Sequence, residues 1–557
     1  MKASHRHTDI PLIGLLNSTE CTVEEIGRVL AQGSNPNCLS LVGENYDQSA
    51  LMIAARMSDP RILKVLLEAG ADPNFVARLG YTAMHTAASA EHVELLAKHG
   101  AIYPKPSYFD TTPLRSAYHF CDFPLTRCLI SIGAPKSEIR VSRLHEIVIN
   151  EVPLTLADII ERYEELEEKD VSNRTPLLLA LESGQVQSAR TLIESGASVN
   201  AKNHHGSTAL HFAARSGSLE AVKLVLEQGI DVCAWDDYEH SALHESLHWE
   251  KGLANFGTGN SVVEYLVQCL SGREEYLREL DDALSACESP QIATWLLNLG
   301  ANLNAMDSEQ RRNLNPSSDI KVSLEMKRDE FLQAANPRFG SQNAEACSEP
   351  FWQQMIVTRE TAFSYREGFE FHFPGSDQNS AGAGPIWCAD RVGQSITWLE
   401  DGRCIEIAGQ HKCGYESDFC IYNDVFVHEP GKLPQIYLYP REIFPPTDFH
   451  TATRVGDWIY IIGSIGYPED RTLNDCPVYQ LNIETLRIEQ VTTTGKDPGR
   501  ICRHRAILRG ERYIEVSDGK LCANGIAYGT PSPPATFDTE CHVWLDVENL
   551  ESTNQEI

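Results

Sequence analysis

The stretch from Ser207 to Val232 constrains the fold of this chain more than any other feature. It contains two short segments with apolar residues at helical spacing, one on either side of Gly217. Thr208 stands where its hydroxyl can cap the first helix, and Gly229 stands where a left-handed residue can close the second. One such helix pair cannot cover its own apolar face, so we expect copies of it to stack against each other.

Copies of this pattern run through the N-terminal half. Equivalent capping residues recur at intervals of 33, 30, 30, 33, 33 and 33 residues, namely Ser49, Thr82, Thr112, Ser142, Thr175, Thr208 and Ser241. The closing glycine recurs as well, at Gly70, Gly100, Gly133, Gly196, Gly229 and Gly300. A period near 33 with this pattern resembles the ankyrin repeat. The resemblance implies an α-solenoid of about nine units, with the first, fifth and last degenerate.

Length and charge bound the remaining possibilities. A chain of 557 residues is too long for one core and suggests roughly three to four domains. The formal net charge of −31 argues against nucleic acid and anionic membrane as partners, because both are polyanions. No apolar run reaches the length of a membrane span, and the 16 cysteines are dispersed in the manner of reduced, core-forming thiols. We therefore expect a cytoplasmic protein.

The pattern predicts three domains. Residues 1–307 form the ankyrin-like solenoid, in which the fifth unit runs into an acidic helix from Asp158 to Lys169. Residues 308–367 form a helical adapter, with one helix from Ile320 to Ala335 and an apolar anchor, Pro350-Phe351-Trp352. Residues 368–557 form an all-β domain.

A second, longer period marks this β domain. Strand-like runs recur around Gln394, His450 and His504, which are 56 and 54 residues apart. A four-stranded blade with turn glycines needs about 50 residues, so this part resembles a kelch-type β-propeller. The fold class is multidomain α plus β. The combination of the two repeat types resembles bacterial ankyrin–kelch proteins, and this resemblance implies no particular activity for the chain.

The number of recognisable blades is smaller than a closed propeller ring normally contains. Propellers usually close with about four to eight blades, and three are recognisable here. Three explanations remain: a partial fourth blade in Glu370 to Pro385, an open stack of sheets, or completion by a second chain in a homodimer through the β domain.

One motif suggests zinc. His244-Glu245-Ser246-Leu247-His248 matches the H-E-x-x-H pattern, in which two imidazoles share one helical face and a carboxylate acts as base. However, His244 occupies the same repeat position as His85, His145 and His211, where the ankyrin resemblance implies a structural histidine that ties the turn. We therefore predict no metal at this motif and no cofactor in the chain.

Two further groups of polar residues lie in the β domain. His411, Cys413 and Cys420 lack the paired spacing of a zinc site, so we interpret them as ordinary loop residues. Asp448, His450 and His504 fall at equivalent blade positions that face the channel of a propeller. They form either a polar pocket or hydrogen bonds between blades.

The hairpin tips of the solenoid are the candidate contact residues. Arg78, Lys202, His204, Trp235 and Asp237 align at these tips. Tryptophan is over-represented among binding hot spots, although packing under a neighbouring hairpin is equally compatible with Trp235. We expect Trp235→Ala to weaken partner binding without lowering the melting temperature if the side chain is a contact residue.

The functional hypothesis is a non-catalytic scaffold that binds a protein partner through its concave solenoid face and hairpin tips. One alternative is an enzyme, either with an active site in the propeller channel or as a zinc hydrolase using His244 and His248. Near-stoichiometric zinc that is lost on His248→Ala would favour the hydrolase. A second alternative is a bacterial immunity or defence protein.

Overall fold

The structure, a computed structural model, describes residues 10–18, 21–40, 47–248, 261–315, 333–334, 336–358, 387–411, 419–471, 475–522 and 530–545. The described residues form two compact units. The first comprises those in Met1–Ala242 and Lys251–Tyr265, and the second those in Leu243–Glu250 and Leu266–Ile557. The predicted adapter helix from Ile320 and the partial blade from Glu370 lie outside the described residues, apart from Gln333 and Ala334 in the former.

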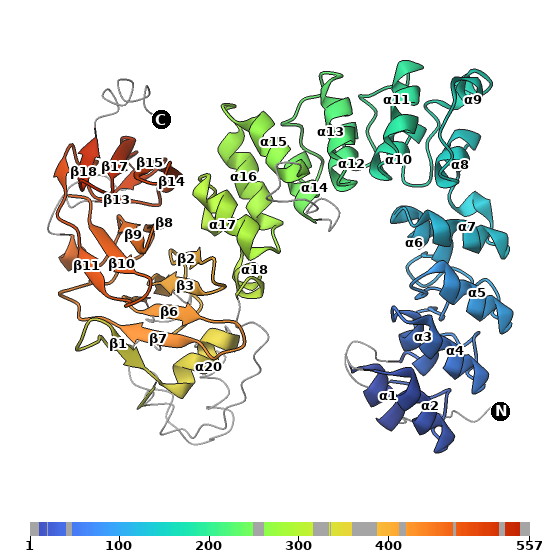
Figure 1. The fold of residues 1–557 in the computed structure, drawn as a ribbon, viewed down its shortest axis with the longest axis horizontal. Helices are drawn as coiled ribbons and strands as arrows, with labels where there is room; N and C mark the ends of the chain where they lie inside the picture. The colour runs from blue at the N-terminus through green and yellow to red at the C-terminus, as the bar shows by residue number, and fades with distance from the viewer. Residues whose placement is uncertain are drawn as a thin grey trace. The chain divides into compact units, whose positions relative to one another are not determined.

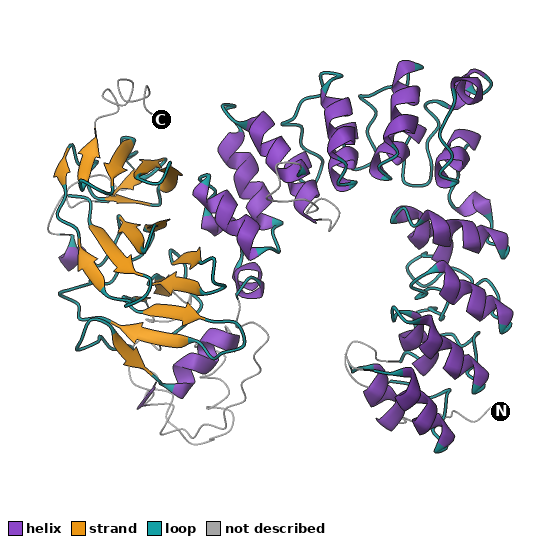
Figure 2. Cartoon of the chain, in the orientation of Figure 1, coloured by secondary structure: helices purple, strands orange, loops and turns teal. Residues whose placement is uncertain are grey.

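The first unit is a stack of short helix pairs (Figures 1 and 2). In regular repeats a helix of six or seven residues is followed by one of eight or nine. The helices are α1 (Ile10–Leu16), α2 (Val23–Ala31), α3 (Ala50–Ala55), α4 (Pro60–Glu68), α5 (Ala90–Lys98), α6 (Pro113–His119), α7 (Phe123–Ser131), α8 (Arg143–Ile149), α9 (Leu156–Ile160), α10 (Pro176–Glu182), α11 (Val186–Glu194), α12 (Ala209–Arg215) and α13 (Leu219–Leu226). Helices α14 (Ala242–His248) and α15 (Val262–Leu270) cross the division between the units.

The predicted caps start these helices. The side chains of Ser49, Thr112, Ser142 and Thr175 each accept a hydrogen bond from the backbone N–H three residues later. Two residues before each predicted cap, the chain turns through a left-handed residue with φ between 49° and 83°. These seven residues are Asp47, Gly80, Asp110, Arg140, Asn173, Gly206 and Glu239.

The structure departs from the sequence pattern in two repeats. After Thr82 the chain forms turns in place of the first helix. The predicted acidic helix from Asp158 to Lys169 is wrong in extent, because α9 ends at Ile160 and only a 3-10 turn, Tyr163–Glu165, follows. Glutamates four residues apart would repel each other along a continuous helix here, which disfavours it.

The second unit combines the last solenoid helices with three sheets that are antiparallel apart from one strand pair. Its helices are α16 (Tyr276–Ser285), α17 (Pro290–Asn298), α18 (Ser308–Asn313) and α20 (Pro350–Thr358). The sheets have the orders β1-β7-β6-β3-β2, β11-β10-β9-β8 and β12-β18-β17-β15-β14, with β12 parallel to β18. Their strands are β1 (Glu345–Cys347), β2 (Ser395–Trp398), β3 (Cys404–Ile407), β6 (Val425–His428), β7 (Gln435–Leu438), β8 (Thr451–Val455), β9 (Trp458–Ile462), β10 (Val478–Asn482), β11 (Ile488–Gln490), β12 (Thr494–Gly495), β14 (Arg505–Arg509), β15 (Tyr513–Ser517), β17 (Ala535–Asp538) and β18 (Val543–Leu545). Two small ladders join β4 (Gln410–His411) to β5 (Cys420–Ile421) and β13 (Ile501–Cys502) to β16 (Lys520–Leu521).

The three sheets repeat one local geometry. Gly393, Phe449 and Arg503 all have positive φ, and each stands two residues before the first residue of β2, β8 or β14. The N–H of Phe449 donates to the carbonyl of Gly393, and the N–H of Arg503 donates to that of Phe449, at 2.8 and 2.9 Å. Strand β8 therefore neighbours both β2 and β14.

On the other side of β2 and β14, the three sheets do not close into a ring within the described residues. Helix α17 packs against both strands instead. At the end of this helix, a Cβ on Gly300 would lie 2.8 Å from the side chain of Ile507, so the fit there is close. Arg505 stabilises the same end of α17. Its guanidinium donates hydrogen bonds of 2.7 and 2.5 Å to the carboxylate of Asp281 and one of 2.8 Å to the carbonyl of Gly300.

The predicted apolar anchor is buried in this unit. Phe351 and Trp352 lie in α20 within a core that includes Phe426 and Ile436. The indole of Trp352 stacks on that of Trp387, with ring centroids 4.5 Å apart. Among the helices that the structure describes, none combines the length and apolar character needed to cross a membrane.

Candidate functional site

The predicted contact residues lie on the loops whose tips are the seven left-handed residues; we call these loops fingers. Arg78, Lys202, His204 and Asp237 are exposed. Trp235 is half-buried and forms an isolated bridge with Ser241. The contact role of Trp235 therefore has less support than that of its four companions.

The fingers carry exposed apolar side chains that the sequence comparison of repeats overlooked. Tyr108 is 81% exposed, Phe109 60%, Leu79 44% and Tyr238 60%. Each lies next to, or one residue from, a left-handed tip residue. That position is the signal that could have identified them, because a side chain beside the tip of a hairpin has few neighbours to cover it.

Neighbouring fingers are joined by backbone hydrogen bonds. The N–H of Tyr108 donates to the carbonyl of Leu79 at 2.9 Å, and that of Asp237 donates to His205 at 2.8 Å. The Nδ1 atom of His204 lies 3.1 Å from the carbonyl oxygen of Ser172. These bonds hold the fingers of each joined pair side by side.

Buried histidines brace the fingers from below. In His145 and His211, Nδ1 lies 2.8 Å from the hydroxyl of the helix cap, Ser142 or Thr208. The Nε2 atom of His145 reaches the carbonyl of Arg174, and that of His211 reaches His240, at 3.0 and 3.1 Å. Each ring thus links its own cap to the next finger, which is the structural role that the repeat pattern predicts.

His244 departs from this arrangement. Its Nδ1 lies 2.9 Å from a carboxylate oxygen of Asp282. Burial by itself lowers the pKa of His244, but the hydrogen bond and charge of Asp282 outweigh burial and raise it above the ordinary value. Glu245 is buried, and the side chain of His248 lies outside the described residues. The imidazole of His244 is therefore already engaged by a carboxylate.

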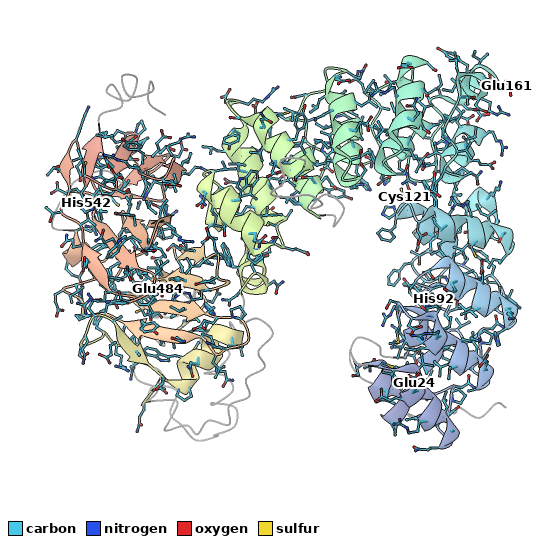
Figure 3. The ribbon with its side chains drawn as sticks, in the orientation of Figure 1. Glu24, His92, Cys121, Glu161, Glu484 and His542 are labelled. Atoms are coloured by element: carbon cyan, nitrogen blue, oxygen red, sulfur yellow. The ribbon has the colours of Figure 1, made fainter. Side chains whose placement is uncertain are left out.

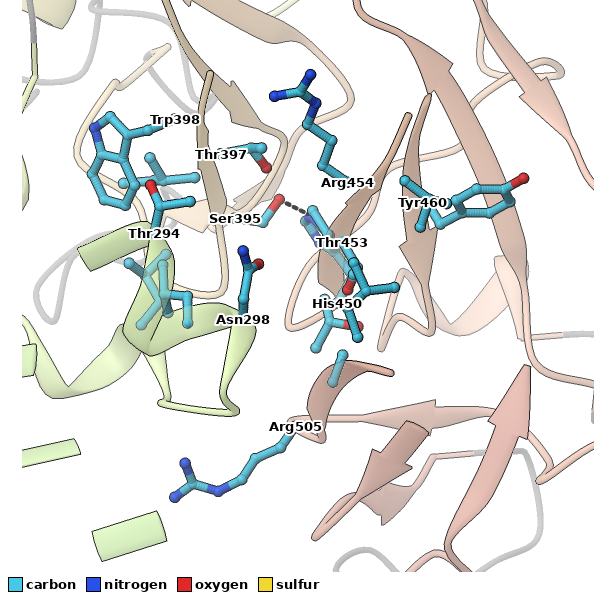
Figure 4. A pocket seen from close by; sticks show the side chains of 18 of the residues that line it. Thr294, Asn298, Ser395, Thr397, Trp398, His450, Thr453, Arg454, Tyr460 and Arg505 are labelled. Carbon is cyan, nitrogen blue, oxygen red and sulfur yellow. Dashed lines mark hydrogen bonds between the residues drawn. The ribbon is translucent and has the colours of Figure 1, made fainter. Parts of the chain in front are cut away.

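The second unit contains a cavity of about 840 Å³ between α17 and the strands β2, β8 and β14 (Figure 4). Thr294 and Asn298 of α17 line one side, and Ser395, Thr397 and Thr453 line the sheets. Predicted pocket residues His450 and His504 also belong to its lining, whereas Asp448 does not. Its size and mixture of hydroxyl, amide and aromatic groups lie within the range of small-molecule sites.

The two cavity histidines join neighbouring sheets. The Nε2 of His450 lies 2.7 Å from the hydroxyl of Ser395, and that of His504 lies 2.8 Å from the hydroxyl of Thr451. Burial lowers the pKa of His450 to about 3, and burial together with the neighbouring His450 lowers that of His504 to about 3. Both rings are thus neutral and already bonded, which makes them poor general bases.

Two other predicted groups have equally local partners. Asp448 accepts a hydrogen bond from the N–H of Gly466 at 2.8 Å, and burial raises its pKa. His411 places Nδ1 2.9 Å from the carbonyl of Asp390. Cys413 lies outside the described residues.

Comparisons with known proteins identify the class of the first unit. The family model for ankyrin repeats matches residues 20–106, 51–137 and 144–236. Residues 20–236 therefore contain ankyrin repeats, which are in general protein-interaction modules.

Solved structures with which the chain aligns carry the same repeats. The ankyrin repeat domain of Bcl-3, a unique member of the IkappaB protein family, is 23% identical with a TM-score of 0.21. That alignment covers 42% of this chain and 92% of the Bcl-3 chain. The human ASB11 ankyrin repeat domain is 21% identical with a TM-score of 0.25, and the alignment covers 48% of this chain and 99% of that one.

Proposed function

We propose that this protein is a non-catalytic scaffold that binds a protein partner through a finger surface. This surface comprises the exposed apolar residues Leu79, Tyr108, Phe109 and Tyr238 and the exposed polar residues Arg78, Lys202, His204 and Asp237. The observation that carries the proposal is the joined pair of tips at Leu79 and Tyr108. The hydrogen bond between these two tips places exposed apolar side chains next to each other. Their exposure contributes nothing to the stability of the fold.

The residue types suit a protein partner. Large aromatic side chains supply most of the energy of typical interfaces, and exposed charges around them set orientation and specificity. The rings of Tyr108 and Phe109 also meet edge to face with centroids 5.4 Å apart, so the two side chains present one apolar contact area.

For the C-terminal region we propose three kelch-type blades, with α17 in the place of the next blade. The spacing of 56 and 54 residues and the repeated hydrogen bonds from Arg503 to Phe449 and from Phe449 to Gly393 support this. In such an arrangement the region anchors the scaffold or holds a second partner. Dimerisation through this region stays a prediction, which light scattering of the purified protein tests.

Affinity capture tests the finger surface. The full-length protein and a Tyr108→Ala/Phe109→Ala variant are used to capture partners from native extract, followed by mass spectrometry. Because both side chains are exposed, we expect an unchanged melting temperature and a loss of about tenfold or more in captured partner. Leu433→Ala, which removes a 44% exposed leucine of the second unit, is the control. Retention of every partner by the double variant would overturn the proposal.

The enzyme alternative has weaker support. The engaged His244 and the neutral, hydrogen-bonded His450 and His504 leave little acid–base capacity at the two predicted sites. Metal analysis of the purified protein, compared with His248→Ala, separates the alternatives, since a hydrolase requires near-stoichiometric zinc that the variant loses.

A further inference from the structure

The fifth repeat contains an irregular segment around α9. Its helix has five residues, where the equivalent helices α4, α7 and α11 have nine. A capping box starts it, because Thr155 and Asp158 exchange hydrogen bonds between side chain and backbone. The helix ends at Ile160, and Arg162 (φ −137°, ψ 36°) turns the chain out of helical geometry.

This segment buries one set of apolar residues and exposes another. Leu154, Ile159 and Leu166 are at most 4% exposed and complete the core. Four large side chains remain in water: Val152 is 54% exposed, Leu156 60%, Ile160 69% and Tyr163 64%. Leu156 and Ile160 stand four residues apart in one helix, so they lie on the same side. We call these four residues the α9 face.

The α9 face is bordered by negative charge. Glu151, Glu161, Glu164, Glu167 and Glu168 are all exposed in the same stretch, which Figure 3 marks at Glu161. Two of these glutamates pair with cations of the chain, because Glu161 lies 3.1 Å from Arg162 and Glu151 lies 2.7 Å from Arg127. Lys169 is exposed in the same stretch. Residues 151–169 contain seven acidic and two basic side chains, so the segment keeps a net negative charge.

The exposed apolar side chains and the acidic border together indicate which kind of partner the α9 face binds. Exposed apolar side chains one helical turn apart match the apolar stripe of an amphipathic helix. The acidic border attracts a basic partner and repels an acidic one. A second copy of this chain would bring the same acidic border against itself in a two-fold dimer, and an anionic membrane would be repelled.

We propose that the α9 face binds a basic amphipathic helix of a partner protein, a site separate from the finger surface.

Fluorescence anisotropy with the full-length protein tests this. The probe is a labelled peptide of about 18 residues, with leucines along one helical face and lysines elsewhere. Its control carries glutamate at every lysine. We expect the basic peptide to bind, the acidic peptide to bind at least about tenfold more weakly, and added salt to weaken binding.

Matched variants locate the site. Leu156→Ser/Ile160→Ser should weaken binding of the basic peptide about tenfold. The control is Val76→Ser/Tyr108→Ser, in which Val76 is a 58% exposed residue just before Arg78 on the same finger, and it should leave binding within about twofold. Both pairs are exposed, and the melting temperature checks each fold. If the first variant unfolds, Glu161→Lys/Glu164→Lys serves instead and should weaken the basic peptide while improving the acidic one.

Four outcomes would overturn the proposal. They are failure of the basic peptide to bind, equal binding of both peptides, equal binding to wild type and the α9 variants, and loss of binding in the finger variant alone. A wild-type dimer that the α9 substitutions dissociate would assign the face to a second copy and reject a partner helix.

Discussion

His450 and His504 occupy one position in successive sheets, and each bonds to a hydroxyl of the sheet before it. The equivalent residue of the first sheet is Gln394, which follows the left-handed Gly393 as the histidines follow Phe449 and Arg503. Inside the molecule, a neutral ring that carries one hydrogen bond is stable, but a charged ring without a counter-ion is costly. The two histidines therefore make the second unit sensitive to acid.

The pH dependence of unfolding tests this. In an unfolded chain the pKa of a histidine is about 6.5, whereas both rings have folded values of about 3. Between these values the unfolded state binds protons that the folded state excludes. The free energy of unfolding therefore falls as the pH drops, by up to about 1.4 kcal/mol per pH unit for each histidine. We expect His450→Gln/His504→Gln to lose less stability than wild type between about pH 6.5 and pH 5 in urea unfolding. Equal losses would contradict the assignment.

At the scale of elements, tight turns hold the sheets at close distance. Gly463 follows β9 with φ 73°, and a Cβ there would lie 2.4 Å from the carbonyl oxygen of Ile501. Because that oxygen belongs to the backbone of β13, which directly precedes β14 of the third sheet, it cannot rotate away as a side chain could. Gly456, in the turn between β8 and β9, has φ 59° but no neighbour within 4 Å of such a Cβ.

These two glycines form a matched pair for mutation. Gly456→Ala imposes the cost of a left-handed alanine alone, about 1 kcal/mol. Gly463→Ala adds a clash with the backbone of β13, and we expect a total loss of about 3 kcal/mol or more. Urea unfolding of both variants measures the difference. Equal effects would show that Gly463 and β13 are not in close contact.

At the scale of the whole molecule, the last solenoid helices and the sheets share one compact unit. Arg505 contacts Asp281 and Gly300, Ile507 contacts Gly300, and the indole N–H of Trp398 donates to the carbonyl of Leu314. The predicted boundary at residue 307 would separate Arg505 and Ile507 from Asp281 and Gly300, whereas Leu314 and Trp398 lie on the same side of it.

Fragments test where the C-terminal unit begins. We expect a fragment of residues 261–557 to unfold cooperatively. A fragment of residues 308–557 exposes the apolar side of β2 and β14 and removes Asp281, the closer of the two carboxylates beside Arg505, so it should melt at a lower temperature or aggregate. Calorimetry and light scattering compare the two. Equal melting temperatures would instead support the boundary at residue 307.

Local periodicity was sufficient to predict the repeats. Capping residues such as Thr112 and Thr175 act within three residues of their own position, and the left-handed tips recur at the same intervals as the caps. Arg78, Lys202, His204 and Asp237 belong to loops that recur with the repeat, and all four are exposed, while their role as contact residues stays a prediction. The bracing role of His145 and His211 also follows from their repeat position.

Contacts between distant residues were not predictable in this way. Asp281 and Arg505 are 224 residues apart, and no local pattern links them. Likewise, Trp235 is half-buried although its repeat equivalent Lys202 is exposed, and four large apolar side chains around α9 are exposed although apolar residues are usually buried. Spacing along the chain determined which units form, because caps and turns are local; packing in three dimensions decided which of their side chains are covered, because burial depends on neighbours that sequence order does not specify.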